Sequence, residues 1–182
     1  MPEKSKNAVE KARGIEQIIW IGDLPAESLP DINRSAIGYE ELIATQPGKF
    51  NPPPLVSDDQ PAHLYYTSGT TAEPKGVILT HKNVIIHAMA AVAEFQLTDA
   101  DTWFHVAPMF HLADAWATFA LTLVGGRHVM IEAFEAGETL RLIEAEKITL
   151  TNLIPTMLNL MVNHPEADKH DYTSLRIILS GG

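Results

Sequence analysis

One stretch, from Tyr66 to Gly76, gathers side chains that could hold a phosphate. It reads Tyr-Thr-Ser-Gly-Thr-Thr-Ala-Glu-Pro-Lys-Gly. Hydroxyls and backbone N–H groups can surround phosphate oxygens, glycines let the backbone approach closely, and Lys75 supplies a point charge. A hydroxyl can also bind the magnesium ion that accompanies a nucleotide, because magnesium takes few protein ligands. This stretch is therefore a candidate phosphate loop.

The order of residues differs from that of the P-loop, in which Gly-Lys-Ser/Thr opens a helix. Here Lys75 precedes a glycine, and the apolar run Val77–Leu79 follows. Serine, threonine and glycine also fill ordinary hairpin loops. Composition alone therefore leaves a flexible hairpin loop open as the alternative.

A second candidate is His111, which follows Pro-Met-Phe and precedes an apolar stretch. An imidazole there could donate a hydrogen bond to a developing negative charge, although a lone histidine in apolar surroundings is also typical of a core. The spacing of His105 and His111 does not fit a helical pair of zinc ligands, and no zincin-like group of acids and histidines accompanies them. The sequence contains no Gly-x-Ser-x-Gly elbow of the serine hydrolases.

Strand and helix patterns alternate from residue 63 onward, which predicts an α/β layer fold with a largely parallel sheet. Thr80 is a candidate N-cap, and Pro155 suits a first helical turn. The predicted strands are His63–Thr67, Val77–Leu79, Trp103–Val106, His128–Ile131, Leu150–Leu153 and Leu175–Leu179, and the predicted helices are His81–Phe95, Leu112–Leu123, Glu138–Lys147 and one after Pro155.

The first part of the chain has a different pattern. We expect a short polar helix at Glu3–Arg13, a buried strand at Ile18–Ile21, and a proline-rich connector over residues 24–62 with a short helix near Tyr39–Ala44. We therefore divide the chain into residues 1–62 and residues 63–182. The second part holds the candidate loop.

Composition sets the class of protein. The 182 residues are 46% hydrophobic and 20% charged, as in an ordinary globular chain. The absence of cysteine excludes a disulfide scaffold and thiol catalysis. A formal charge of −10 argues against an extended nucleic-acid surface. With no export signal and no apolar run of about 20 residues, we expect a cytoplasmic chain without a transmembrane segment, and leave peripheral membrane contact open.

The candidate loop and three further stretches resemble the adenylate-forming (AMP-binding) superfamily, which includes acyl-CoA synthetases, adenylation domains of peptide synthetases and firefly luciferase. The loop together with Val77–His81 resembles the superfamily signature, and Ala107–His111 resembles its second motif. Ile154–Met157 and Leu175–Gly182 resemble the run that leads into the adenine-binding loop. The motifs are closest to those of fatty acyl-CoA synthetases. The resemblance implies the large N-terminal domain of that fold.

The resemblance implies a reaction in two steps. A carboxylate, here that of a fatty acid, attacks the α-phosphate of ATP to give acyl-AMP and pyrophosphate, and the CoA thiol then displaces AMP. ATP, Mg²⁺ and CoA are the implied cofactors and co-substrates. By motif position, His111 faces the carboxylate and the α-phosphate, Gly181 and Gly182 lie along the adenine, and Thr71 is also assigned to Mg²⁺. The residues assigned to the β- and γ-phosphates are Thr67, Ser68, Gly69, Thr70, Thr71 and Lys75.

Two differences from the superfamily matter. Ala72 stands where its members usually have glycine, and a positive φ there would cost about 1–2 kcal/mol. The magnesium acid, the ribose aspartate and the C-terminal domain with its catalytic lysine are expected beyond Gly182. We therefore expect the chain to be the central part of the N-terminal domain, to bind ATP weakly and to be catalytically incomplete alone.

Other functions stay open. One is a nucleotide-binding or regulatory module that does not ligate, and another is a structural segment with an empty loop. The acid could also be aromatic, or an amino acid, although amino-acid adenylation domains usually read Gly-Ser-Thr-Gly where this chain has Gly69–Ala72.

Overall fold

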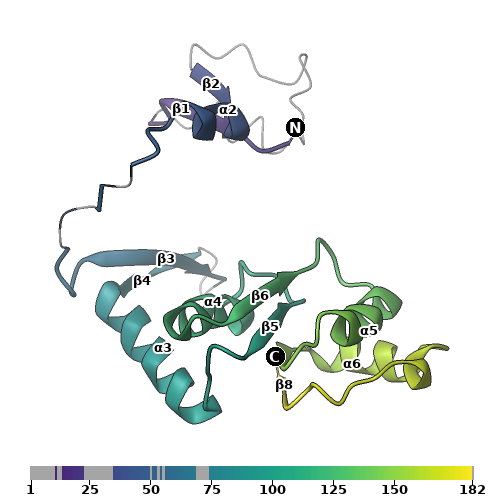
Figure 1. Cartoon of the computed structure of the whole chain (residues 1–182). Helices are drawn as coiled ribbons and strands as arrows, with labels where there is room; N and C mark the ends of the chain where they lie inside the picture. Colours follow the sequence, from purple (N-terminus) through teal and green to yellow (C-terminus); the bar gives the residue numbers. More distant parts are fainter. Residues whose placement is uncertain are drawn as a thin grey trace. The chain divides into compact units, whose positions relative to one another are not determined.

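The computed structural model describes residues 11, 14–22, 35–49, 51–52, 54, 56–68 and 74–181. The chain forms two compact units, Met1–Pro54 and Leu55–Gly182, which are described separately (Figure 1). The second unit contains the described ends of the candidate phosphate loop and the sheet that follows it. The domain division after residue 62 stays a prediction.

The first unit contains a parallel pair of short strands. β1 (Gln17–Trp20) lies beside β2 (Ser35–Gly38), and α2 (Tyr39–Ala44) follows β2 directly. The sequence predicts α2 with these bounds. It does not predict β2, which lies inside the proline-rich connector and has no clear apolar alternation.

The prediction of a buried strand at Ile18–Ile21 is wrong in its burial. Ile19 is 49% exposed and Ile21 is 79% exposed. The reason is that, among the described residues, β1 pairs only with β2, and the short helix α2 that contacts it is too small to bury both faces of the strand. The helix expected at Glu3–Arg13 lies outside the described residues except for Lys11, which is helical.

The second unit begins with an antiparallel hairpin. β3 (Pro61–Thr67) and β4 (Lys75–Thr80) form a two-stranded sheet of their own. Both strands are where the sequence predicts them, but they are not part of the parallel sheet. Antiparallel neighbours can be joined by a short loop, whereas parallel neighbours need a long crossover. The short stretch between Thr67 and Lys75 permits only the first arrangement.

The helix α3 (His81–Phe95) begins at a capping box, as Thr80 predicts. The Asn83 N–H donates to Thr80 Oγ1 over 3.2 Å, and the Thr80 N–H donates to Asn83 Oδ1 over 3.0 Å. These bonds satisfy backbone groups that a helix start otherwise leaves unpaired. The helix ends at Gln96, which has a left-handed φ of 50°.

Four parallel strands form the main sheet, in the order β6-β5-β7-β8. The α/β fold with a parallel sheet is therefore confirmed. No helix in the described ranges is both long enough and apolar enough to cross a membrane. The elements are β5 (Thr102–His105), α4 (Leu112–Val124), β6 (Arg127–Met130), α5 (Ala136–Ala145), β7 (Leu150–Asn152), α6 (Pro155–Val162), the 3-10 helix η1 (Ala167–Lys169) and β8 (Ile177–Leu179).

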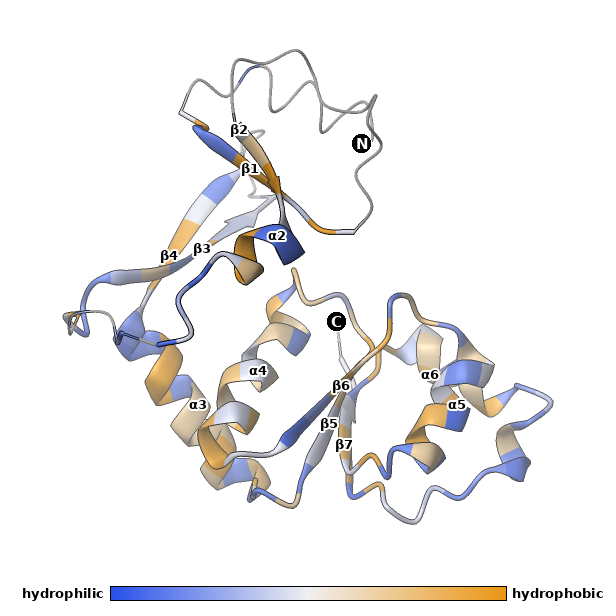
Figure 2. Ribbon diagram, turned by 45° about the horizontal axis from the view of Figure 1, so that its top comes forward, coloured by the Kyte–Doolittle hydropathy of each residue, from blue (hydrophilic) through white to orange (hydrophobic). Residues whose placement is uncertain are grey.

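Helices cover both faces of this sheet. Trp103 of β5 packs in a core with α3 and α4, and its neighbour Phe104 packs in a second core with α5 and α6. Adjacent residues of a strand point to opposite faces, so one strand supplies both cores. Figures 1 and 2 show the sheet between these two pairs of helices.

Two glycines allow the tight turn from α4 into β6. Gly125 ends the helix with a left-handed φ of 77°. A Cβ on Gly126 would lie 2.5 Å from Leu121 Cδ1 and 3.0 Å from the Asp101 carbonyl oxygen. The turn therefore excludes side chains at both positions, and this close approach sets where β6 starts beside β5.

Candidate functional site

Three of the predicted phosphate ligands lie where the hairpin closes. Thr67, the last residue of β3, pairs with Lys75, the first residue of β4, and Ser68 follows Thr67. All three are exposed. A lysine and two hydroxyls thus lie together at one end of the hairpin. The remaining predicted residues, which are Gly69, Thr70, Thr71 and Gly182, lie outside the described residues, as does Ala72.

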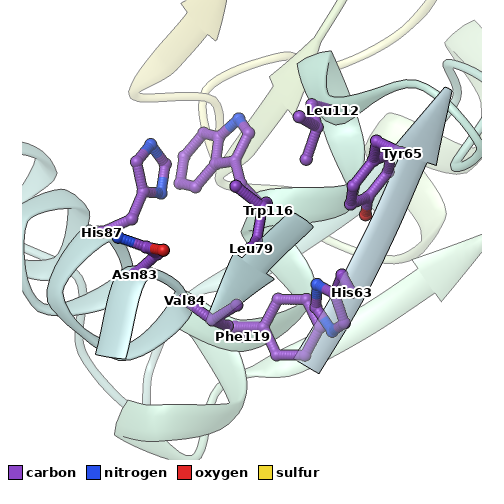
Figure 3. Close-up of a pocket in the computed structure, with 9 residues that line it drawn as sticks. All are labelled: His63, Tyr65, Leu79, Asn83, Val84, His87, Leu112, Trp116 and Phe119. Carbon is purple, nitrogen blue, oxygen red and sulfur yellow. The ribbon is translucent and has the colours of Figure 1, made fainter. Parts of the chain in front are cut away.

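The hairpin places Thr67 and Lys75 on the same face as a cavity of about 350 Å³. Along a strand every second side chain shares a face, and directly paired residues share one too. Tyr65 lines the cavity, so Thr67 and its partner Lys75 lie on the cavity side. The cavity lies between the hairpin, α3 and α4 (Figure 3). Its lining residues are His63, Tyr65, Leu79, Asn83, Val84, His87, Leu112, Trp116 and Phe119.

His111 stands directly before α4 and next to the cavity. Its carbonyl oxygen accepts the N–H groups of Asp114 (3.3 Å) and Ala115 (3.2 Å), so His111 is the N-cap residue of the helix. Its side chain is exposed, lies against the Phe110 ring at 4.7 Å between centroids, and makes no hydrogen bond to the described residues. The next residue, Leu112, lines the cavity beside Tyr65 (Figure 3). The imidazole is therefore exposed, next to a residue that lines the cavity.

The small residues of α4 do not line this cavity. The sequence suggests that Ala113, Ala117 and Ala120 leave room for an acyl chain, but Ala117 and Ala120 are fully buried in the core that α3 and α4 share. Their small size lets the two helices approach closely, with Ala88 and Ala91 on the facing helix. The cavity instead meets the i, i+4, i+7 face of α4, formed by Leu112, Trp116 and Phe119.

Gly181 lies at the same edge of the sheet as the loop that carries His111. Gly181 follows β8, and His111 follows β5, at the carboxyl ends of these parallel strands. One strand, β7, separates them, which corresponds to about 10 Å at ordinary strand spacing. Ligands of open α/β sheets bind at such an edge. A Cβ on Gly181 would meet no protein atom within 4 Å, so packing against the described residues does not require a glycine there.

The structure contains one polar cluster that the sequence does not predict. The Trp103 indole N–H donates to Asp114 Oδ1 (3.0 Å), and His105 Nδ1 lies 2.6 Å from Asp114 Oδ2. His105 Nε2 is 2.9 Å from His128 Nδ1, and His128 Nε2 is 3.1 Å from Thr122 Oγ1. The sequence places Asp114 in the first turn of a helix, where the dipole favours an acid, and so predicts a structural role without naming these partners. A histidine in an otherwise apolar strand was the available signal, but its partners are too distant in sequence to identify.

This cluster does not join the two histidines weighed as zinc ligands. His105 is buried against Asp114, whereas His111 is exposed beyond the end of β5. No three His, Cys, Asp or Glu side chains in the described part of the chain form a group that could hold a metal ion.

His128 makes the stability of the chain depend on pH. Burial, together with the neighbouring His105, lowers its pKa below the ordinary 6.5, although Asp114 acts in the opposite direction. As the pH falls below 6.5 the unfolded chain therefore binds this proton before the folded chain does, and the free energy of unfolding falls until the folded-state pKa is passed. We expect urea titrations between about pH 5 and 8 to show this loss, and His128→Gln to reduce it.

A matched control for that titration is Met130→Gln on the same strand, because Met130 is 60% exposed and does not titrate. It should leave the pH dependence unchanged. An identical slope in wild type and His128→Gln would show that other groups cause the acid sensitivity.

The comparisons with known proteins identify the family of the chain. The family model described as AMP-binding enzyme matches residues 3–182. The chain is 30% identical over 184 residues to the medium/long-chain-fatty-acid–CoA ligase FadD8 of Mycobacterium tuberculosis, an alignment that covers 98% of this chain and 30% of that ligase.

Two solved structures show the same fold. The inhibitor-bound N-terminal domain of FACL13 from Mycobacterium tuberculosis has a TM-score of 0.73 at 26% identity, and covers 81% of this chain and 38% of that one. The o-succinylbenzoate CoA synthetase of Bacillus subtilis, in complex with ATP and a magnesium ion, has a TM-score of 0.70 at 28% identity, with coverages of 82% and 31%. The chain thus spans about a third of the length of the proteins it matches.

Proposed function

Because the chain belongs to the AMP-binding enzyme family, we propose that it is the part of an acid–CoA ligase that holds the phosphates of ATP and the carboxylate of the acid. The complete reaction would form acyl-AMP and pyrophosphate, and would then transfer the acyl group to CoA. One observation carries this proposal. The paired Thr67 and Lys75 lie on the same face of the hairpin as an apolar cavity that adjoins His111.

The proposal assigns a chemical role to each described residue of the site. The Lys75 ammonium and the hydroxyls of Thr67 and Ser68 would bind phosphate oxygens, and so stabilise the negative charge that grows on the departing pyrophosphate. His111 would donate its N–H to an oxygen that gains charge when the carboxylate attacks the α-phosphate. The end of the hairpin and the start of α4 would present these groups to the ligand.

The described end of the loop also fits a nucleotide that carries Mg²⁺. It offers neutral hydroxyls and one lysine, and no carboxylate that would compete with phosphate for the ion. Magnesium usually keeps several waters and takes few protein ligands in such sites. Thr71, the residue we propose to hold it, lies outside the described residues. The ion would offset phosphate charge, and the related Bacillus synthetase was solved with both ATP and magnesium.

The cavity supports an acid with an apolar body. Leucine, valine and aromatic side chains dominate its lining, and His63 and Phe119 close part of it with ring centroids 5.0 Å apart (Figure 3). Its volume is at the lower end of the range for small-molecule pockets, about 300–1,000 Å³. We propose a fatty acid as the substrate, in line with FadD8, which is named for medium and long chains. An aromatic acid is the alternative, because a related enzyme is named for o-succinylbenzoate.

The test is a chimaera in which this chain replaces the matching third of FadD8. Purified chimaera would be assayed for pyrophosphate release with ATP, magnesium, CoA and a panel of fatty and aromatic acids, beside the 182-residue chain alone. We expect acid-dependent turnover from the chimaera, and weak ATP binding without acyl-CoA formation from the chain alone. A folded chimaera that binds ATP but forms no adenylate would favour a nucleotide-binding module.

Lys75 should matter for the use of ATP. A hydrogen bond to a charged group is typically worth about 1.5–3 kcal/mol, so Lys75→Ala in the chimaera should raise the KM for ATP, or lower kcat/KM, about tenfold or more. Steady-state rates with varied ATP measure this. Lys82→Ala is the control, because Lys82 is also exposed but lies on α3, outside the loop. Equal constants for the two variants would remove Lys75 from the site.

A further inference from the structure

The first turn of α4 lacks the cap that helix starts usually have. His111, the N-cap residue of this helix, makes no side-chain capping hydrogen bond. Asp114 lies in the first turn, where an acid ordinarily interacts with the exposed N–H groups of the helix. Here its carboxylate is directed at β5 instead, and receives Trp103 and His105. Contacts with the sheet therefore replace local capping at this helix end.

A second contact from the sheet holds the same turn. The side-chain amide of Asn152, a buried residue of β7, donates to the Ala113 carbonyl oxygen over 2.9 Å. The Trp116 indole N–H donates to the same oxygen over 3.0 Å. Side chains of the adjacent strands β5 and β7 thus form hydrogen bonds with Ala113 and Asp114. These two residues follow His111 within one helical turn.

Moving the Asp114 carboxylate away from these hydrogen-bond partners would cost considerable free energy. It is 0% exposed, and a buried charge that loses its partners is strongly destabilising. The chain of hydrogen bonds continues through His105 to His128 on β6, and returns to α4 at Thr122. Both imidazoles therefore have partners at both nitrogens. A fully satisfied buried network of this kind favours one geometry over its alternatives.

We propose that Asp114 is a positioning residue for adenylation. By locking the first turn of α4 to β5, it sets where His111 and Leu112 stand relative to the sheet edge and the cavity. This inference rests on the function proposed above, because His111 matters only if the acid and the α-phosphate meet there. A network that served stability alone would have no preference for the helix end that carries His111.

Three variants separate positioning from stability. Asp114→Ala removes the network. Asp114→Asn preserves it, because the amide oxygen can still accept the Trp103 N–H and the amide N–H₂ can donate to His105 Nδ1. Leu121→Ala is the matched control, since Leu121 is fully buried in the second half of the same helix and its apolar side chain makes no hydrogen bond to the network.

The kinetic prediction concerns kcat and not the binding of ATP. In the chimaera, Asp114→Ala should lower kcat for adenylate formation by about 10²-fold, the effect expected of a misplacement near 1 Å. The KM for ATP should change little, because the phosphate ligands stand on the separate hairpin. Asp114→Asn should recover most of the rate. Leu121→Ala should lower the melting temperature at least as much as Asp114→Ala, yet retain kcat at a temperature where all variants are folded.

A second measurement, hydrogen exchange, does not depend on catalysis. In the 182-residue chain, hydrogen exchange of the Ala115 amide reports its bond to the His111 carbonyl oxygen. Asp114→Ala should speed this exchange about tenfold, and Leu121→Ala should not. If the wild-type chimaera is inactive, the proposed function fails, and this exchange alone decides whether Asp114 holds the segment. Unchanged exchange in Asp114→Ala, or equal losses of kcat in Asp114→Ala and Leu121→Ala, would overturn the positioning role.

Discussion

Replacing His111 with alanine in the chimaera is expected to slow acyl-adenylate formation by about 10²–10³-fold, the usual effect of removing one donor from a site of developing charge. The melting temperature should hardly change. The side chain is exposed, lies against the Phe110 ring and makes no hydrogen bond to the described residues. Single-turnover pyrophosphate release and thermal unfolding of the same preparation measure the two effects together.

Two further variants sharpen this prediction. His111→Gln keeps a donor at a similar reach and should recover part of the rate. His81→Ala, at the start of α3, removes another imidazole far from the sheet edge and should leave the rate unchanged. A large fall in melting temperature with normal turnover would make His111 a packing residue and would remove it from the chemistry.

Replacing Arg176 with alanine is expected to lower the free energy of unfolding by about 1.5–3 kcal/mol, because the buried Asp101 carboxylate loses its cationic partner while Thr98 and Thr149 still donate to it. Nε and Nη2 of Arg176 each donate to one oxygen of Asp101 over 2.9 Å, and Asp101 is only 4% exposed. Nη1 and Nη2 also reach the carbonyl oxygens of Phe95 and Gln96, at 2.8 and 3.2 Å. One guanidinium thus ties the end of α3 to the segments that precede β5 and β8.

The control for this loss is Arg141→Ala. Arg141 makes a salt bridge of similar geometry to Glu138, but both side chains are about half exposed, so the change should lower the free energy of unfolding far less than Arg176→Ala does. Urea unfolding of the two variants at neutral pH gives the comparison. Equal losses would mean that the Asp101 pair contributes no more than a surface pair.

Acid unfolding tests the same pair. Burial alone would raise the pKa of Asp101, but hydrogen bonds from Arg176, from the Thr98 N–H and from Thr149 outweigh it and hold the pKa below the ordinary 3.8. The stabilisation is therefore complete above this ordinary value and is lost as the pH falls through the lower folded-state pKa. The loss should be smaller in Arg176→Ala than in wild type.

Some features of this chain follow from neighbouring residues alone. The helix α3 has the bounds that Thr80 and the apolar spacing after it predict, and α6 starts at Pro155. These signals depend on free energies within one or two turns, namely capping bonds and the fixed φ of proline. The spacing of hydroxyls, glycines and Lys75 is equally local. It identified the family of the chain without any knowledge of its folding.

The arrangement of the sheet could be predicted only in part from the sequence. Alternating strands and helices predict a parallel sheet, but not that the hairpin β3–β4 stays outside it or that β7 lies between β5 and β8. Each segment could pair with several others, and the choice depends on which helical faces the crossovers bury. Similarly, β2 formed in a proline-rich connector because pairing with β1 compensates for a weak local preference.

Tertiary structure alone decided which side chains of α4 serve which purpose. The sequence shows alanines, aromatics and one acid on a single helix, and a helix pattern does not say which face meets the sheet. Packing against α3 buried Ala117 and Ala120, and this left Trp116 to line the cavity. Asp114 met His105 only because β5 runs beneath that face, and His128 joined them because β6 pairs with β5. Interactions between residues so distant along the chain form only after the strands have paired, and for that reason no local pattern encodes them.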